Sequence, residues 1–223
     1  DHVPVIDEDG LQVPYEEEIR AALDCGYQSV MVDGSRLDLD GNIAATARIC
    51  ELAHAYGVPV EAELGAVMGH EEGPMPPYEE LFASGKGFTD PDEAERFVDR
   101  SGCDWLSVAI GSVHGAISAT KRHEQKIQAR LSIPHLQRLG QRLDTPFVLH
   151  GGTGISRDDI RSGIANGIAK INIATAIRQP YEAHGADGSD AALDAVHRAA
   201  CQVIRDELGC IGTASSLSQG AHS

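Results

Sequence analysis

Three histidines lie where short apolar segments of the chain end, and imidazole is a common ligand of zinc. His2 follows Asp1, whereas His114 and His150 each precede a glycine. Three imidazoles that leave one coordination position open form the ligand set of a catalytic zinc site. A single histidine of this kind is more often a hydrogen-bonded surface or core residue. Three in equivalent positions, each beside Gly or Asp, favour one shared zinc ion.

The segments that carry these histidines alternate with helical patterns. Short apolar runs rich in β-branched residues predict buried parallel strands, and 3.6-residue spacing of apolar positions predicts crossover helices between them. Asp90 before Pro91, and Ser156 before two acidic residues, are typical helix starts. Strands are expected at 28–34, 58–65, 105–111, 146–151 and 169–175, and helices from 16, over 42–56, from 90, over 132–143, from 156 and over about 193–208.

This alternation predicts an α/β fold, and polar residues at the carboxyl ends of strands are typical of a (β/α)8 TIM barrel. Five strands are complete, and His2 is expected to end a sixth, so the barrel is expected to be truncated at its N-terminus. We expect a single domain over residues 1–223. Residues 3–15 are expected to form an exposed loop, residues 66–89 a lid-like loop, and residues 210–223 a flexible tail.

The composition excludes several classes of partner. The 223 residues include 18 basic and 34 acidic side chains, a formal charge of −16. Such a charge disfavours nucleic acid and anionic membranes as partners. We see neither an apolar run long enough for a membrane span nor a secretory leader. The five cysteines form no Cys-x-x-Cys pair, so we expect a reduced, cytoplasmic protein.

Seven short motifs in the same order make the chain resemble the class II, zinc-dependent fructose- and tagatose-bisphosphate aldolases. The resemblance covers residues 1 to about 209, and that family forms a (β/α)8 barrel. The motifs are Asp1-His2, Val30-Met-Val-Asp-Gly-Ser35, Val60-Glu-Ala-Glu-Leu-Gly65, Thr89-Asp-Pro91, Val108-Ala-Ile-Gly111 with His114-Gly115, Val148-Leu-His-Gly-Gly152 and Ala169-Lys-Ile-Asn-Ile-Ala-Thr175.

The resemblance implies that His2, His114 and His150 hold Zn²⁺. Zinc would activate dihydroxyacetone phosphate and stabilise its ene-diolate, in place of the Schiff-base lysine of a metal-free aldolase. The resemblance also implies a reversible cleavage of a ketose 1,6-bisphosphate to dihydroxyacetone phosphate and glyceraldehyde 3-phosphate.

Two carboxylates match acid–base positions of the family. Asp1 corresponds to the proton donor for the aldehyde or C4 oxygen, although it could instead orient the imidazole of His2. Glu71 lies in a segment similar to the family's Gly-Gly-x-Glu-Asp lid motif, which implies that it moves the proton at the carbon beside the ketone. Met68 and Glu72 depart from that motif, and Glu71 could equally be a solvated loop residue.

Asp33 and Glu63 end neighbouring strands and resemble positions that hold a second cation, a monovalent one, in some members of the family. Carboxylates on adjacent strands suit a cation site. Helix capping, or a hydrogen bond to a zinc-ligand imidazole, explains the two residues equally well.

A phosphate site is expected where a glycine-rich turn leaves a strand and enters a helix, because the free N–H groups there can surround an anion. The loops after the seventh and eighth strands are the usual phosphate site of a barrel. The resemblance assigns substrate binding to Gly115, Gly151, Gly152, Thr153, Asn172, Ile173, Ala174 and Thr175, with Asn172 also catalytic through a hydrogen bond to the ene-diolate.

Ala174 bears on the choice of substrate. Many fructose-bisphosphate members of the family have Asp at this position, whereas tagatose-bisphosphate members have Ala, so the chain leans toward the tagatose type. The small-molecule partner is therefore a phosphorylated sugar. The resemblance also implies a homo-oligomer, a dimer or tetramer. A non-catalytic or companion-dependent subunit and an aldolase for another phosphosugar remain alternatives. His135, His184 and His197 are expected on the surface.

Overall fold

The computed structural model describes residues 2–65, 77–112 and 129–215. The chain divides into two compact units, residues 1–172 and residues 173–223. The first unit contains the sheet, and the second consists of helices.

The first unit is built on a parallel sheet whose strands follow the order of the chain. Strand β3 is buried along its whole length, as expected of a sheet covered on both faces. Parallel strands in sequential order, joined by crossover helices, are the arrangement of a (β/α)8 barrel. Among the described residues the strands are β1 (Val3–Pro4), β2 (Val30–Asp33), β3 (Val60–Leu64), β4 (Trp105–Val108), β5 (Phe147–Leu149) and β6 (Ile168–Ile171).

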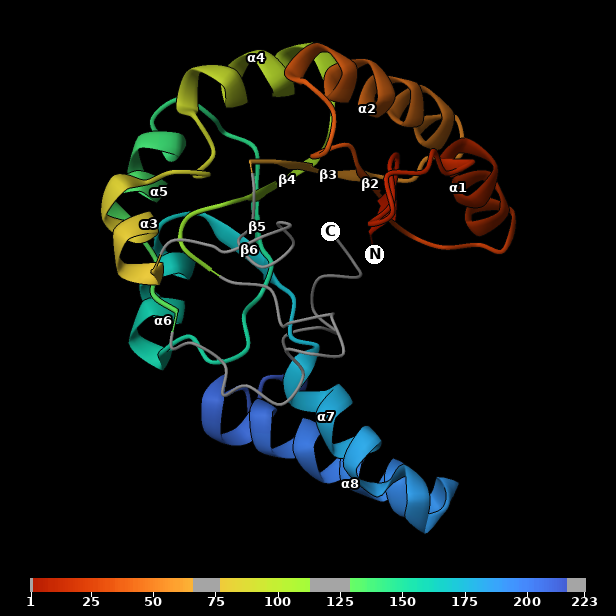
Figure 1. The fold of residues 1–223 in the computed structure, drawn as a ribbon, viewed down its shortest axis with the longest axis vertical. Helices are drawn as coiled ribbons and strands as arrows, with labels where there is room; N and C mark the ends of the chain where they lie inside the picture. The colour runs from red at the N-terminus through yellow and green to blue at the C-terminus, as the bar shows by residue number, and fades with distance from the viewer. Residues whose placement is uncertain (1, 66–76, 113–128, 216–223) are drawn as a thin grey trace. The chain divides into compact units, whose positions relative to one another are not determined.

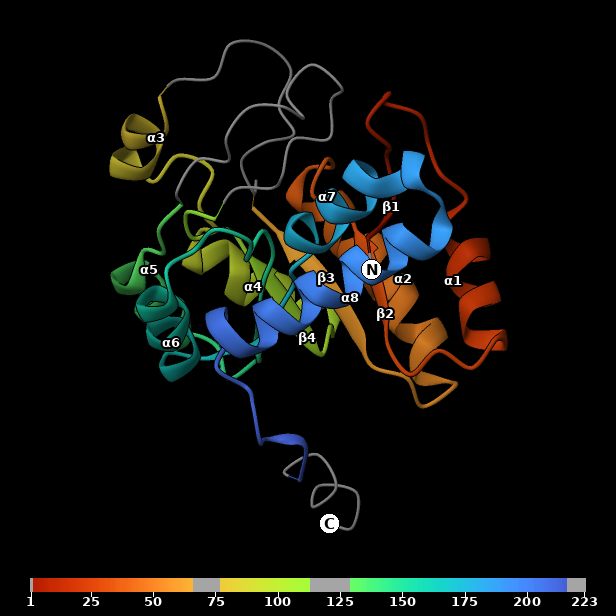
Figure 2. The same ribbon diagram turned by 90° about the horizontal axis from the view of Figure 1, so that it is seen from below.

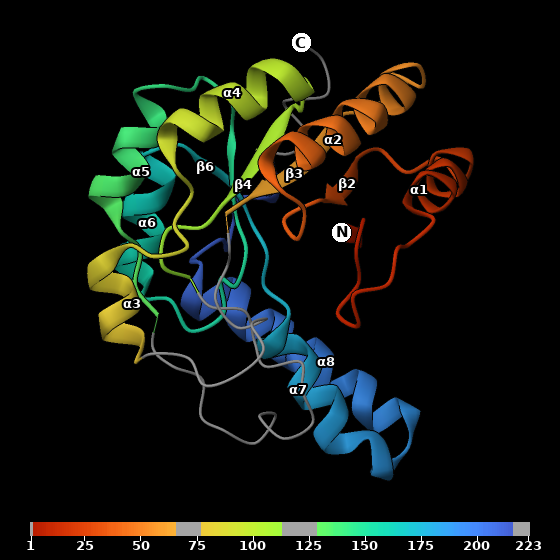
Figure 3. The same cartoon turned by 45° about the horizontal axis from the view of Figure 1, so that its top comes forward.

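Helices cover the outer side of these strands, as Figures 1 and 3 show. Phe97 and Leu136 are fully buried on the inner faces of their helices. The side chain of Asp90 accepts hydrogen bonds from the N–H groups of Asp92 and Glu93, and that of Ser156 accepts one from Asp159, so both expected helix starts are confirmed. The helices of this unit are α1 (Tyr15–Asp24), α2 (Leu39–His54), α3 (Tyr78–Ser84), α4 (Pro91–Ser101), α5 (Ile133–Gly140) and α6 (Arg157–Ala165).

The second unit contains two helices that lie side by side (Figure 2). Helix α7 spans Thr175–His184 and helix α8 spans Ser189–Gln202, with a 3₁₀ turn at Gly185–Asp187 and a π-helical turn at Val203–Glu207. Helix α7 was not expected from the sequence. Helix α7 contains Pro180 and has no buried residue. Its sequence therefore lacks the apolar spacing of an amphipathic helix, and proline is unusual within a helix.

The expectation of an exposed loop over residues 3–15 was wrong in its first part. Val3 and Pro4 pair with Val32 and Asp33 of β2, and Val5 is buried. Strand β1 thus follows His2, whereas a strand had been expected to end at His2. Pro4 has no backbone N–H group, but an edge strand tolerates this loss on its unpaired side. The proline is therefore compatible with a strand.

Part of the expected lid-like loop is a helix. Residues 66–76 lie outside the described part of the chain, but α3 occupies residues 78–84 and ends at Gly85 in the left-handed conformation. The hydroxyl of Tyr78 donates a hydrogen bond to the carbonyl of Gly111 (2.9 Å) and accepts one from the N–H of Arg130 (2.8 Å). Tyr78 therefore joins α3 to both ends of the segment between Ser112 and Ala129.

Thr89 joins the ends of β3 and β4. Its hydroxyl donates to the carbonyl of Leu64 (2.5 Å) and accepts from the N–H of Ala109 (2.8 Å), and the side chain is fully buried. Gly65, at φ +95°, passes so close that a β-carbon there would lie 2.7 Å from the Thr89 hydroxyl. Thr89 thus bonds a backbone group at the end of each of the two strands.

His135 is buried at 8% exposure, which corrects the expectation that it lies on the surface. Its Nε2 donates a hydrogen bond to the carbonyl of Thr89 (2.7 Å), and Arg138 donates one to its Nδ1 (2.7 Å). Both bonds require a neutral imidazole with its hydrogen on Nε2. From the sequence alone, a polar residue on a helix is expected to be exposed, because a hydrogen-bond partner that is distant in the chain cannot be recognised. His184 and His197 are exposed, as expected.

The protonation of His135 is expected to make stability depend on pH. Burial lowers the pKa of His135, and Arg138 lowers it further, against the opposing effects of the Thr89 carbonyl and Asp90. Below its ordinary pKa of 6.5 the unfolded chain binds a proton that the folded chain resists, so stability is lost as the pH falls.

Unfolding in urea at pH 7.5, 6.5 and 5.5 measures this effect. The His135→Gln variant should lose less stability on acidification than the unsubstituted chain, with a difference in slope of at most about 1.4 kcal/mol per pH unit. The exposed His197→Gln variant is the matched control. Equal slopes in the unsubstituted chain and the His135→Gln variant would contradict the role given to His135.

Candidate metal centre

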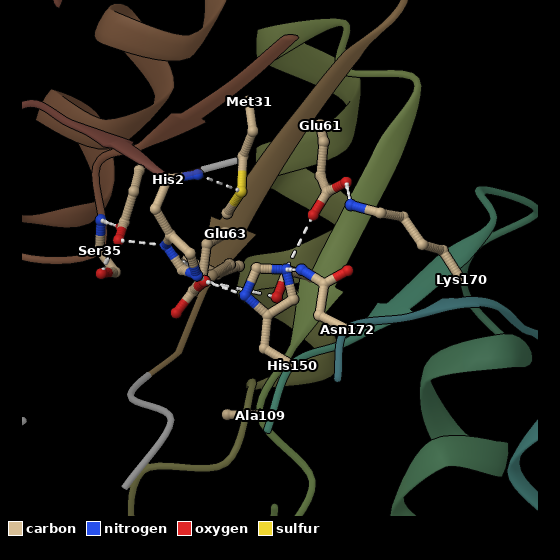
Figure 4. Close-up of polar contacts among 12 residues, drawn as sticks. His2, Met31, Ser35, Glu61, Glu63, Ala109, His150, Lys170 and Asn172 are labelled. Atoms are coloured by element: carbon tan, nitrogen blue, oxygen red, sulfur yellow. Dashed lines mark hydrogen bonds and ion pairs between the residues drawn. The ribbon is translucent and has the colours of Figure 1, made fainter. Parts of the chain in front are cut away.

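Two histidines and a glutamate converge on one face of the sheet. His2, Glu63 and His150 each offer a ligand atom, and these atoms lie within 4.8 Å of one another. The rings of His2 and His150 meet edge to face, with their centroids 4.5 Å apart (Figure 4). Among the described residues this is the one group of three His, Cys, Asp or Glu side chains with metal-binding spacing.

The alternation of β3 explains how carboxylates reach this face. Side chains of a strand point alternately to its two sides, so Glu61 and Glu63 share one side and Val60, Ala62 and Leu64 take the other. Both glutamates are buried, at 2% and 4% exposure. Other parts of the fold must supply partners for both carboxylates, because burying an unpaired charge costs free energy.

His2 takes its position from a strained backbone and three contacts. Its φ is +41°, in the left-handed region that residues other than glycine seldom adopt. The Nδ1 atom lies 3.2 Å from Asp33 Oδ2 and 3.9 Å from Glu63 Oε2, and the backbone N–H faces the sulfur of Met31 at 3.2 Å. Burial alone would lower the pKa of His2, but Asp33 and Glu63 raise it above the ordinary value.

Asp33 is held ionised at the end of β2. The N–H and hydroxyl of Ser35 donate to its Oδ1 at 3.0 and 2.6 Å. Burial would raise the pKa of Asp33, but the hydrogen bonds from His2 and Ser35 lower it to about 2. Asp33 therefore presents a fixed negative charge to the ring of His2.

Glu63 has the opposite tendency. Burial, together with the nearby charge of Asp33, raises the pKa of Glu63 to about 8, and a hydrogen bond from Ser107 at 3.4 Å offsets this only in part. Its Oε2 lies 3.4 Å from His150 Nδ1. A buried carboxylate that resists ionisation beside two imidazoles is a place where a cation would replace a proton.

His150 follows β5 and is 1% exposed. Its Nε2 lies 2.9 Å from Glu61 Oε1 and 2.9 Å from the side-chain nitrogen of Asn172. Burial lowers the pKa of His150, and the nearby His2 lowers it too, against the pull of Glu61. The ring is thus favoured in its neutral form, which is the form that binds a metal.

The structure places some of the expected site residues together. His2 and His150 lie together with Glu63, Asn172 contacts His150, and Asp33 contacts His2. Glu61 and Lys170, which contact this cluster, were missed, because nothing local in the sequence pairs a residue of β3 with one of β6.

The other expected residues are not tested by this cluster. Gly151, Gly152 and Thr153 lie between β5 and α6. Ile173, Ala174 and Thr175 belong to the second unit. Asp1, Glu71, His114 and Gly115 fall outside the described residues.

Residues 1–212 match the model of the family described as fructose-bisphosphate aldolase class-II. The chain belongs to the class II fructose-bisphosphate aldolase family. It is 40% identical over 159 residues to a probable fructose-bisphosphate aldolase of Bacillus subtilis, and 39% identical over the same length to a fructose-bisphosphate aldolase of Staphylococcus aureus. Each alignment covers 71% of this chain and 50% of the relative, so the chain spans about half the length of these curated relatives.

Solved structures of the family have the same fold. The YdjI aldolase from Escherichia coli K12 superposes with a TM-score of 0.63 at 33% identity, covering 84% of this chain and 64% of that one. A putative fructose-1,6-bisphosphate aldolase from Coccidioides immitis gives 0.69 at 27% identity, covering 96% and 72%. The expected barrel-type α/β fold is confirmed. No helix in the described part of the chain has the length and apolar character needed to cross a bilayer.

Proposed function

We propose that the chain is a zinc-dependent aldolase that reversibly cleaves a ketose 1,6-bisphosphate. The observation that carries this proposal is the convergence of His2, Glu63 and His150 in a member of the class II family. The products are dihydroxyacetone phosphate and glyceraldehyde 3-phosphate. A protein of this kind is expected in the cytoplasm as a dimer or tetramer.

The side chains of this cluster fit a zinc ion. Two imidazoles and a carboxylate are ligands that zinc accepts, and His150 is favoured in the neutral form that coordination requires. His114 is proposed as a further ligand. Asp33, which contacts the ring of His2, then orients that ring and adds basicity to it, or shares a second, monovalent cation with Glu63.

In this proposal the residues of the chain bind the substrate and move its protons. When bound, zinc supplies a Lewis acid that polarises the ketone and acidifies the neighbouring carbon. In the cleavage direction Asp1 accepts the proton of the C4 hydroxyl as the C3–C4 bond breaks, and Glu71 returns a proton to C3. Asn172, beside His150, hydrogen-bonds the oxygen that becomes negative.

Substrate phosphate is proposed to bind at the turn that opens α6. Gly151, Gly152 and Thr153 precede the helix, and Gly151 and Gly154 adopt positive φ, which turns the chain sharply there. The positive end of a helix dipole attracts an anion even in a protein of charge −16. Ile173, Ala174 and Thr175, which belong to the second unit, are proposed as substrate contacts from the family resemblance, and Ala174 favours the tagatose type.

The test uses the 223-residue chain stripped of metal and reloaded with zinc. Tagatose 1,6-bisphosphate and fructose 1,6-bisphosphate are supplied in turn, and the release of triose phosphate is followed. A second assay follows the exchange with solvent of a proton on the hydroxymethyl carbon of dihydroxyacetone phosphate. We expect zinc-dependent turnover and exchange. One zinc per chain without either reaction would contradict the proposal and favour a companion-dependent subunit, whereas turnover of another phosphosugar alone would correct the substrate.

A further inference from the structure

We infer that Lys170 and Glu61 are positioning residues that orient His150, so that its Nδ1 atom faces the metal ligands. The inference rests on the proposed function, because it takes His150 to be a ligand.

Lys170 and Glu61 meet across the sheet. The Nζ atom of Lys170 lies 2.6 Å from Glu61 Oε2, although β6 and β3 are separated by β4 and β5. Both side chains must therefore lie on the same face of the sheet as His150 (Figure 4). Glu61 is 2% exposed, whereas the side chain of Lys170 is 40% exposed. The ammonium group of Lys170 thus donates a hydrogen bond to one oxygen of the buried carboxylate and holds the other oxygen toward His150.

The Glu61 carboxylate, held by Lys170, fixes which ring nitrogen of His150 carries the hydrogen. Both oxygens of a carboxylate accept hydrogen bonds and neither donates. Since Glu61 Oε1 lies 2.9 Å from His150 Nε2, that nitrogen must carry the hydrogen. The lone pair of a neutral ring then resides on Nδ1, which faces Glu63 Oε2 at 3.4 Å. Glu61 therefore selects the nitrogen that can bind a metal.

The contact of Asn172 agrees with this assignment in one of its two amide orientations. Its side-chain amide lies 2.9 Å from the same Nε2. With the hydrogen on Nε2, the amide oxygen must face the ring, because two donors would repel each other. The amide nitrogen of Asn172 is then turned away from the ring and can donate to another group.

A purely structural ion pair would have different consequences. Removing Lys170 would then destabilise the fold but would leave the ring of His150 and its affinity for metal unchanged in the molecules that remain folded. An orienting pair predicts a weaker site in a folded chain, since residues that orient metal-ligating histidines typically change affinity by about 10- to 100-fold.

The experiment compares Lys170→Met with Lys170→Arg in the 223-residue chain. Zinc affinity is measured by competition with a chromophoric chelator, and the hydrogen position on His150 by ¹H–¹⁵N NMR of the metal-free chain labelled at histidine. The control is Arg142→Met, which removes a cation from the exposed pairs with Asp92 and Glu95. Circular dichroism melts report folding separately, and Lys170→Gln replaces Lys170→Met should the latter not fold.

We expect the Nε2–H form of His150 in the unsubstituted chain. Lys170→Met should lose that single form and bind zinc about 10- to 100-fold more weakly, whereas Lys170→Arg and Arg142→Met should stay within about threefold of the unsubstituted chain. An Nδ1–H ring in the unsubstituted chain, or unchanged affinity in folded Lys170→Met, would overturn the inference alone. An unsubstituted chain that binds no zinc would overturn the proposed function with it.

Discussion

Replacing His150 with alanine is expected to abolish retention of zinc and, with it, any aldolase activity. His150 is 1% exposed and contacts Glu61 and Glu63, so no other side chain among the described residues can take its place from solvent. Coordination by three or four ligands contributes on the order of 10 kcal/mol at neutral pH. Loss of one ligand should therefore weaken binding by on the order of 100-fold or more.

The measurement is zinc per chain after gel filtration, followed by titration of the metal-free protein. His197→Ala is the matched control, because His197 is exposed on α8 and should leave zinc content unchanged. A melting curve for each variant separates loss of metal from loss of fold. If folded His150→Ala kept one tightly bound zinc per chain, the metal centre described above would be wrong.

Substituting alanine for Gly111 is expected to cause the largest loss of stability. Gly111 has φ +112°, and a β-carbon there would lie 2.6 Å from the carbonyl of Arg130 and 2.6 Å from the ring of Phe82. The backbone strain costs about 1–3 kcal/mol and the overpacking another 1–3 kcal/mol. The free energy of unfolding should fall by about 2–6 kcal/mol, a large part of the total for a typical domain.

Urea unfolding followed by circular dichroism measures this loss. The control is Gly57→Ala, because Gly57 has φ +72° but no atom within 4 Å of the added β-carbon. That variant should lose only about 1–2 kcal/mol, from backbone strain. Equal losses in the two variants would show that contact with Phe82 and Arg130 contributes nothing.

Local patterns were enough to predict most of the first unit. The apolar segments that became β2 to β6 and the capping residues Asp90 and Ser156 depend on neighbours within a few positions, so the sequence shows them directly. His150 lies directly after an apolar run, as its sequence indicates, whereas the strand expected to end at His2 instead begins after that residue, and only the tertiary structure brings the two rings together.

What escaped prediction depends on partners that are distant in the chain. Lys170 contacts Glu61 across 109 positions, and the burial of His135 depends on the carbonyl of Thr89, 46 positions away. Helix α3 lies beside a segment rich in Gly and Pro, whose composition indicated a loop. In each case the local sequence favours an exposed side chain or a loop, and a tertiary contact stabilises the buried side chain or the helix instead.

The two imidazoles that meet at the centre come from positions near opposite ends of the first unit, and β1 beside His2 has only two paired residues. An ion bound by both rings would connect His150 to the edge of the sheet formed by β1, which has few hydrogen bonds. Its binding free energy would add to the free energy needed to open that edge. The metal-loaded protein should therefore exchange the amide hydrogens of β1 more slowly and melt at a higher temperature than the metal-free protein.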